Sequence, residues 1–178
     1  QHFYAESPLA VSVECAITLP MQKTLLTFVD DIYEDLELWY PKLRVEESGY
    51  AMRVAGPELR TYAGKHGYPA ASDLLIKEAR SQDFCGLLIP GGFMPDKLRR
   101  DPKVLSLTRE FFEQGKLVAF ICHGGWIPIS AKILNGKRVT GSLGIKDDLE
   151  NALKTKQGGV LIEGLYPNGM RAYYGFGI

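Results

Sequence analysis

Hydrophobic residues gather along the chain in short runs with the length and composition of buried β-strands. The runs at 23–29 and 117–121 are rich in β-formers and lack a polar alternation, which is typical of strands covered on both faces. The stretches 50–56 and 83–89 have the same character, and the second leads into Pro-Gly-Gly. We therefore expect four buried strands.

Between these strands, apolar positions recur with helical spacing. The strongest helix is predicted over 101–116, with Asp101 as N-cap, Pro102 in the first turn and Gly115 at the end. A second helix is predicted over 124–137 and ends at Asn135-Gly136.

The stretch 30–50 predicts a further helix, with Leu36, Trp39 and Leu43 on one apolar stripe and Gly49 as its stop. Pro41 falls inside it, so we expect a kink or a late start. Residues 57–73 are rich in turn formers and predict a loop with room for a short strand pair, whereas 73–82 fits a helix or a strand equally well.

This alternation of strands and helices predicts an α/β sandwich of three layers, because right-handed crossovers place helices on both faces of a mainly parallel sheet. Functional groups in such sheets collect at the carboxyl ends of the strands. Three of those ends carry chemistry here: Asp30-Asp31 with Glu34, then Pro90-Gly91-Gly92, then Cys122-His123. We expect them to meet at one edge.

The amino-acid composition limits the classes of binding partner that can be expected. The 21 Lys and Arg balance the 21 Asp and Glu, so no nucleic acid or anionic membrane is expected, and no apolar run has the roughly 20 residues of a membrane span. Three cysteines without metal or redox spacing favour a reducing, cytoplasmic location, and no metal or cofactor is expected. Residues 1–20 lack Lys and Arg and are interpreted as an appendage of unknown role before a domain that starts near Met21.

Cys122 is the strongest candidate for a catalytic residue. It follows a strand and precedes Gly124-Gly125, so a tight strand-to-helix turn would strain its backbone and expose its sulfur, as in a nucleophile elbow. A helix N-terminus behind the sulfur would favour the thiolate. Taken alone, the pattern also fits an ordinary buried cysteine at a turn, and Phe120 stands where the hydrolase elbow has glycine.

Several motifs in order make the stretch from about 21 to 152 similar to the PfpI-type intracellular proteases, in the superfamily of the Parkinsonism-associated protein deglycases. They are "YEDLELWYP" (33–41), "GKHGYP" (64–69), "LLIPGGFMPDKLRRD" (87–101), "VAFICHGG" (118–125), "AKILNGKRVTGS" (131–142) and "IKDDLENA" (145–152).

The resemblance implies a flavodoxin-like, glutamine-amidotransferase-type fold and a Cys122 nucleophile with His123 as acid/base. It implies that Glu34 is the buried acid bonded to the cysteine, and a carboxyl beside a thiolate should stay protonated. The backbone N–H groups of Gly92 and His123 would form the oxyanion hole. Asp96 would act from a neighbouring subunit on the histidine, where a glutamate is common, so a homodimer or higher oligomer is expected.

Departures from the family pattern concern the pocket and the ends. Gly125-Trp126 follows "ICHG" where proline is usual, and Trp126 with Gly91 and Phe93 is expected to line the pocket. Residues 21–178 would form one domain with an atypical tail at 153–178, which contains a predicted hairpin around 167–169 but no closing helix.

Several functions fit this pattern. Attack by Cys122 on a small reactive carbonyl, as in a deglycase or glyoxalase III, is favoured because Trp126 and Phe93 would crowd a long substrate; the substrate would be a small molecule or a glycated protein. PfpI-type peptide hydrolysis and isonitrile hydration begin with the same step. A cysteine redox sensor and an inert stress protein are the non-enzymatic alternatives.

Overall fold

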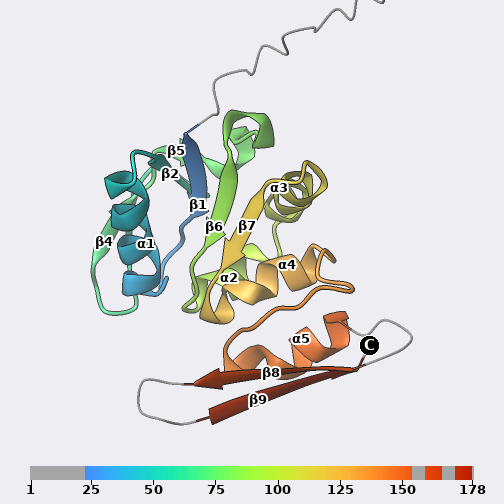
Figure 1. Ribbon diagram of the computed structural model, residues 1–178. Helices are drawn as coiled ribbons and strands as arrows, with labels where there is room; N and C mark the ends of the chain where they lie inside the picture. Colours follow the sequence, from blue (N-terminus) through green and yellow to red (C-terminus); the bar gives the residue numbers. More distant parts are fainter. Residues whose placement is uncertain (1–22, 154–158, 166–170, 178) are drawn as a thin grey trace, which may run out of the picture.

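A parallel five-stranded sheet forms the centre of the molecule in the computed structural model, which describes residues 23–153, 159–165 and 171–177 (Figure 1). The strand order is β5-β2-β1-β6-β7. The strands are β1 (Thr24–Phe28), β2 (Ala51–Gly56), β5 (Leu74–Leu75), β6 (Gly86–Ile89) and β7 (Leu117–Phe120). All four predicted strands are confirmed, and the undecided stretch 73–82 contributes the short β5 and then a 3-10 helix over Ile76–Glu78.

Helices cover both faces of this sheet. Helix α1 (Asp35–Glu47) connects β1 to β2, and α3 (Pro102–Glu113) connects β6 to β7. The two crossovers run outward in opposite directions from the central β1–β6 pair, so their common right-handedness places α1 and α3 on opposite sides of the sheet (Figure 1). The flavodoxin-like α/β fold is therefore confirmed.

The core is built where the strands meet these helices. Fully buried side chains come from the central strands, α1 and α3, among them Leu26, Phe28, Leu38, Leu87, Ile89, Leu107 and Phe111. The Asp101 carboxylate accepts a hydrogen bond from the Lys103 backbone N–H at 2.8 Å, so the predicted cap of α3 is confirmed. One buried polar atom of the described chain, Thr27 Oγ1, has no hydrogen-bond partner.

Helix α1 buries a different side from the predicted stripe. Leu38 is fully buried, whereas Leu36 is 74% and Leu43 is 52% exposed. The helix starts at Asp35 and is continuous through Pro41. Gly49 has φ +81° just beyond its end, which confirms the predicted stop.

The helix predicted over 124–137 is much shorter in the structure. A 3-10 helix over Cys122–Gly125 leads into α4 (Trp126–Ser130), and Lys132 then turns the chain with φ 59°. Ile133 and Leu134, which follow that turn, pack with α5 (Lys146–Leu153) in a second core that also contains Ala131, Ile145, Leu149 and Leu153.

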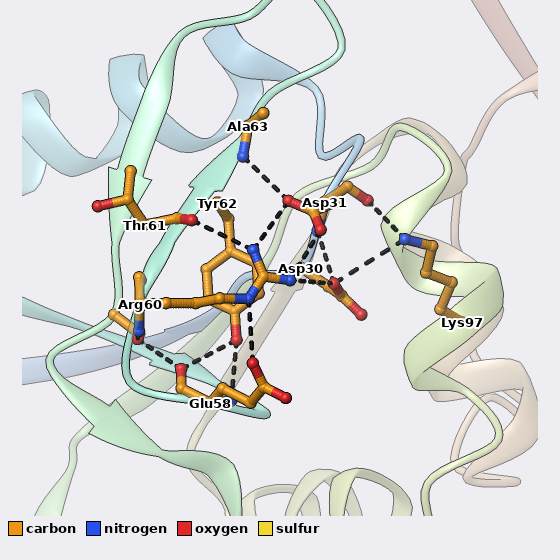
Figure 2. Close-up of polar contacts among 9 residues, drawn as sticks. Asp30, Asp31, Glu58, Arg60, Thr61, Tyr62, Ala63 and Lys97 are labelled. Carbon is orange, nitrogen blue, oxygen red and sulfur yellow. Dashed lines mark hydrogen bonds and ion pairs between the residues drawn. The ribbon is translucent and has the colours of Figure 1, made fainter.

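A small antiparallel hairpin, β3 (Thr61–Ala63) and β4 (Pro69–Ala71), stands beside the sheet and confirms the strand pair expected in this loop. Its base is tied to the loop after β1 by Arg60, as Figure 2 shows. The Arg60 guanidinium donates to both carboxylate oxygens of Asp31, at 2.7 and 3.2 Å, and Asp31 also accepts the Ala63 N–H at 3.1 Å. Lys97 lies 3.9 Å from Asp30 on the other side (Figure 2).

The remaining elements complete the chain. They are α2 (Met94–Leu98), 3-10 helices over Ser81–Asp83 and Leu143–Ile145, and the antiparallel strands β8 (Gly159–Leu165) and β9 (Arg171–Gly177). The last two are the strands of the predicted C-terminal hairpin, whereas its turn at 167–169 and the appendage at 1–20 lie outside the described residues. None of the helices in the described ranges has the length and apolar character that would let it cross a membrane.

Candidate active site

The three predicted strand ends meet at one edge of the sheet, because β1, β6 and β7 are neighbours. The Glu34 backbone N–H donates to the Gly91 carbonyl at 3.1 Å, and Tyr33 forms an isolated bridge with Gly92. Cys122 and His123 follow β7 at the same edge. The expected convergence is therefore confirmed.

Cys122 occupies a strained elbow, as the sequence predicted. Its φ of 52° lies in the left-handed region, which costs a residue with a side chain about 1–2 kcal/mol. Gly124 makes the turn possible, since a Cβ there would lie 2.4 Å from the Ile89 carbonyl oxygen. The strained backbone at Cys122 therefore destabilises the fold slightly but holds the Cys122 side chain at the end of the sheet.

His123 contacts the thiol directly. Its Nδ1 lies 3.1 Å from the Cys122 sulfur, and its ring centroid lies 5.1 Å from that of Trp126. Burial, and then the charge of Lys65, lowers the pKa of His123, so its imidazole is neutral at pH 7. A neutral imidazole at this distance can accept the thiol proton.

The carboxyl group beside the sulfur belongs to Glu37, whereas the sequence analysis expected Glu34 there. Glu37 Oε2 accepts the Gly91 N–H at 2.8 Å, and its carboxyl interacts with the thiol through a hydrogen bond. Both residues stand in one acidic run (Asp30, Asp31, Glu34, Asp35 and Glu37), and it is the Glu37 side chain that turns toward the end of β6, where it bonds Gly91.

Glu34 pairs with the β3–β4 hairpin instead. Its Oε2 lies 3.2 Å from Lys65 Nζ and its Oε1 lies 3.5 Å from His66 Nδ1. It still lines the pocket that contains Cys122. The expected contact with the sulfur is therefore corrected, and Glu34 is placed in an ion pair at the pocket wall.

The thiol is less acidic than the sequence suggested. Burial, and then the charge of Glu37, raises the pKa of Cys122, while the His123 N–H and the Ser142 hydroxyl act in the opposite direction. Burial also raises the pKa of Glu37. The two groups therefore hold less negative charge together than they would apart, and Cys122 needs a base to become a nucleophile.

Two of the three predicted pocket residues, Phe93 and Trp126, line a cavity together with this thiol. A cavity of about 640 Å³ is lined by Ile32, Glu34, Lys65, Gly92, Phe93, Cys122, His123 and Trp126. Trp126 is held in place, since its indole N–H donates to Asp148 at 2.8 Å and Arg99 lies over its ring. Gly91, the third predicted residue, lies behind the cavity, and a Cβ there would lie 2.6 Å from Glu37 Oε2 and 3.0 Å from Cys122 Cβ.

The two proposed oxyanion donors differ in their surroundings. The His123 N–H points to the Cys122 side chain, and no acceptor in the described part of the chain takes the Gly92 N–H. Asp96 lies in the first turn of α2, where its carboxylate accepts from Arg100 at 2.7 Å. Its action across a subunit interface stays a prediction.

One group of side chains has the composition of a metal site. Among the described residues, ligand atoms of Glu34, Asp35 and His66 lie within 4.8 Å of one another. Both Asp35 oxygens already accept backbone N–H groups, and the Lys65 ammonium lies against Glu34. A positive charge in that position disfavours a cation, so these residues do not fit a metal.

Sequence reasoning missed Glu37, Lys65 and Ser142 as neighbours of the site. Glu37 was visible in the acidic run and Lys65 in the motif "GKHGYP", but spacing alone does not show which side chain turns toward the thiol. Ser142 could not be found in this way, because it lies 20 residues beyond Cys122 in an irregular segment.

Known proteins are similar to this chain over most of its length. The DJ-1/PfpI family model matches residues 23–161. "Deglycase PH1704" of Pyrococcus horikoshii is 43% identical over 120 residues, which are 67% of this chain and 72% of that protein. "Putative cysteine protease YraA" of Bacillus subtilis is 39% identical over 133 residues, 74% of this chain and 79% of that protein.

Solved structures agree with the fold. A two-domain protein of Anabaena variabilis with dj-1/thij/pfpi-like and ferritin-like domains superposes with a TM-score of 0.72 and 33% identity, over 79% of this chain and 41% of that one. Schizosaccharomyces pombe DJ-1, at 21% identity, matches the fold with a TM-score of 0.66 over 78% of this chain and 79% of its own. With its five-stranded parallel sheet, its cysteine elbow and these matches, the chain belongs to the DJ-1/PfpI family.

Proposed function

We propose that this protein is a cysteine-dependent enzyme that acts on small reactive carbonyl compounds, as a deglycase or glyoxalase III does. The observation that carries the proposal is the 3.1 Å contact between the Cys122 sulfur and His123 Nδ1, beside a pocket of about 640 Å³. The names of the deglycase relatives support the same class of substrate.

The first step follows from the protonation states. Neutral His123 accepts the Cys122 proton through Nδ1, and the sulfur forms a bond to the carbonyl carbon. The π electrons of the carbonyl move onto its oxygen, which becomes an oxyanion. The Gly92 N–H, unbonded within the described residues, is available to that oxygen.

The shape of the pocket favours a small substrate. Phe93 and Trp126 lie on its wall, and the indole of Trp126 is fixed by Asp148, so the wall does not yield easily to a long chain. Ile32 adds an apolar surface suited to a short aliphatic group.

The test is a panel of methylglyoxal, glyoxal, glycated amino acids and casein, with wild type, Cys122→Ser and His123→Ala. We expect carbonyl consumption that is lost in Cys122→Ser and about 100-fold slower in His123→Ala. Hydrolysis of casein without consumption of carbonyl compounds would instead favour a peptidase function, which the name of the relative "Putative cysteine protease YraA" suggests.

A redox-sensing cysteine is less well supported. Sensor cysteines combine exposure with a lowered pKa. Cys122 is half-buried, and burial raises its pKa.

A further inference from the structure

The motif "GKHGYP" at 64–69 forms a rigid loop at the tip of the β3–β4 hairpin. Buried Asp35 holds it, because its carboxylate accepts the backbone N–H groups of His66 at 2.9 Å and Tyr68 at 2.8 Å. Gly64 allows this contact, since a Cβ there would lie 2.3 Å from Asp35 Oδ1. The Lys65 N–H donates to the Tyr33 carbonyl at 2.8 Å. The backbone of Lys65 is thus fixed against the start of α1.

This fixed backbone places the Lys65 side chain at the wall of the pocket. Lys65 lines the same cavity as Cys122 and His123, and its charge contributes to the lowered pKa of His123. Glu34 is the one hydrogen-bond acceptor of Lys65 Nζ in the described ranges, so two of the three N–H donors of the ammonium remain open.

The Lys65 side chain is expected to contribute little to the stability of the fold. Asp35 already holds the loop through the backbone, and the Lys65 side chain is 55% exposed, where an ion pair contributes little to stability. A cation on the wall of the pocket that contains the nucleophile attracts anionic groups of molecules that enter the pocket.

We propose that Lys65 is a substrate-binding residue that recognises a carboxylate or another anionic oxygen of the substrate, which replaces Glu34 as its partner. This inference rests on the proposed function. The preferred substrates would then be small carbonyl compounds that carry an anionic group, such as 2-oxo acids and glycated amino acids with a free carboxylate.

The experiment compares alkylation of Cys122 by iodoacetate and by its neutral analogue iodoacetamide. In both reactions the sulfur forms a bond to carbon and iodide leaves, and peptide mass spectrometry measures the rate at Cys122. A change in thiol pKa affects both reagents alike, so the ratio of the two rates isolates recognition of the carboxylate.

We expect Lys65→Met to lower the iodoacetate-to-iodoacetamide ratio about 10-fold. Glu34→Gln should raise this ratio, because the substitution frees the Lys65 ammonium from its ion pair. Lys65→Arg should preserve most of the ratio, because it keeps the positive charge. Lys23→Met is the matched control: Lys23 is exposed and precedes β1 at the opposite edge of the sheet, so its ratio should equal that of wild type.

An unchanged ratio in Lys65→Met, with iodoacetamide still reacting at Cys122, overturns the proposal. The readout needs no turnover. If the wild-type protein consumes no carbonyl compound, but Lys65→Met still lowers the iodoacetate-to-iodoacetamide ratio, the proposed function is contradicted and the anion site is supported.

Discussion

At the scale of single residues, the decisive feature is which carboxyl group lies beside the nucleophile. Cys122 and His123 could be identified from the sequence because three strand ends that carry functional groups were expected to meet at one sheet edge, and because the surrounding motifs resemble a known family. The family resemblance led to Glu34 as the acid beside the sulfur, although Glu37 stands in the same acidic run and spacing alone does not show which of the two side chains turns toward the thiol. In the structure Glu37 bonds the Gly91 N–H and interacts with the thiol, and Glu34 bonds Lys65.

This assignment predicts how the thiol titrates. Glu37→Gln removes a negative charge that raises the pKa of Cys122, so the pKa of the thiol should fall. The pH dependence of iodoacetamide alkylation measures it. Glu34→Gln is the comparison, with a smaller expected effect because Glu34 does not bond the sulfur; a larger shift in Glu34→Gln than in Glu37→Gln would restore the family-based assignment.

At the scale of elements, the strands, the cap of α3 and the stop of α1 were predictable, whereas the length of α4 and the buried face of α1 were not. The strands followed from apolar runs, and α3 followed from Asp101, Pro102 and Gly115. Helix α4 is shorter than its pattern because the residues after Lys132 pack into a second core with α5, a tertiary contact that periodicity does not contain. The exposed face of α1 has the same origin: its contacts with the sheet decide which apolar residues are buried.

The geometry of the elbow between β7 and α4 predicts that alanine substitutions at two adjacent glycines, Gly124 and Gly125, differ in their effect on stability. A Cβ at Gly124 would lie 2.4 Å from the Ile89 carbonyl oxygen, so backbone must move; a Cβ at Gly125 would meet the Ile145 Cδ1 methyl at 2.7 Å, which can rotate away. We expect Gly124→Ala to cost about 2 kcal/mol or more and to slow alkylation of Cys122, and Gly125→Ala to cost about half as much. Urea unfolding and labelling rates measure both, and equal effects in the two variants would contradict a backbone-limited elbow.

At the scale of the whole molecule, ion pairs join the hairpin that carries Lys65 to the sheet edge that carries Cys122. Arg60 connects the loop after β1 to β3 through Asp31 (Figure 2). The hydrogen bond from Arg60 is the main cause that lowers the pKa of Asp31 in the folded state. A carboxyl whose folded pKa lies below its unfolded value of about 3.9 stabilises the fold above that pH, and this contribution is lost as the pH falls through the folded pKa.

Asp31→Asn should therefore lower the urea midpoint at pH 7 and lower it less at pH 3, because the stabilisation by the carboxylate decreases once the pH falls below the unfolded-state pKa. Unfolding curves at both pH values measure this difference, and Asp147→Asn, an exposed position on α5, is the control. A destabilisation by Asp31→Asn that is the same at pH 3 and pH 7 would show that the charge of Asp31 is not what holds the hairpin.

The central claim is that turnover proceeds through the Cys122 sulfur. The most direct measurement is partial alkylation with iodoacetamide, followed by peptide mass spectrometry of Cys122 and Cys85 and by methylglyoxal consumption on the same samples. The account predicts that the remaining activity equals the fraction of unmodified Cys122 and does not follow Cys85, whose sulfur lies 3.3 Å from the Thr24 carbonyl oxygen. Full activity in protein whose Cys122 is completely alkylated would contradict it.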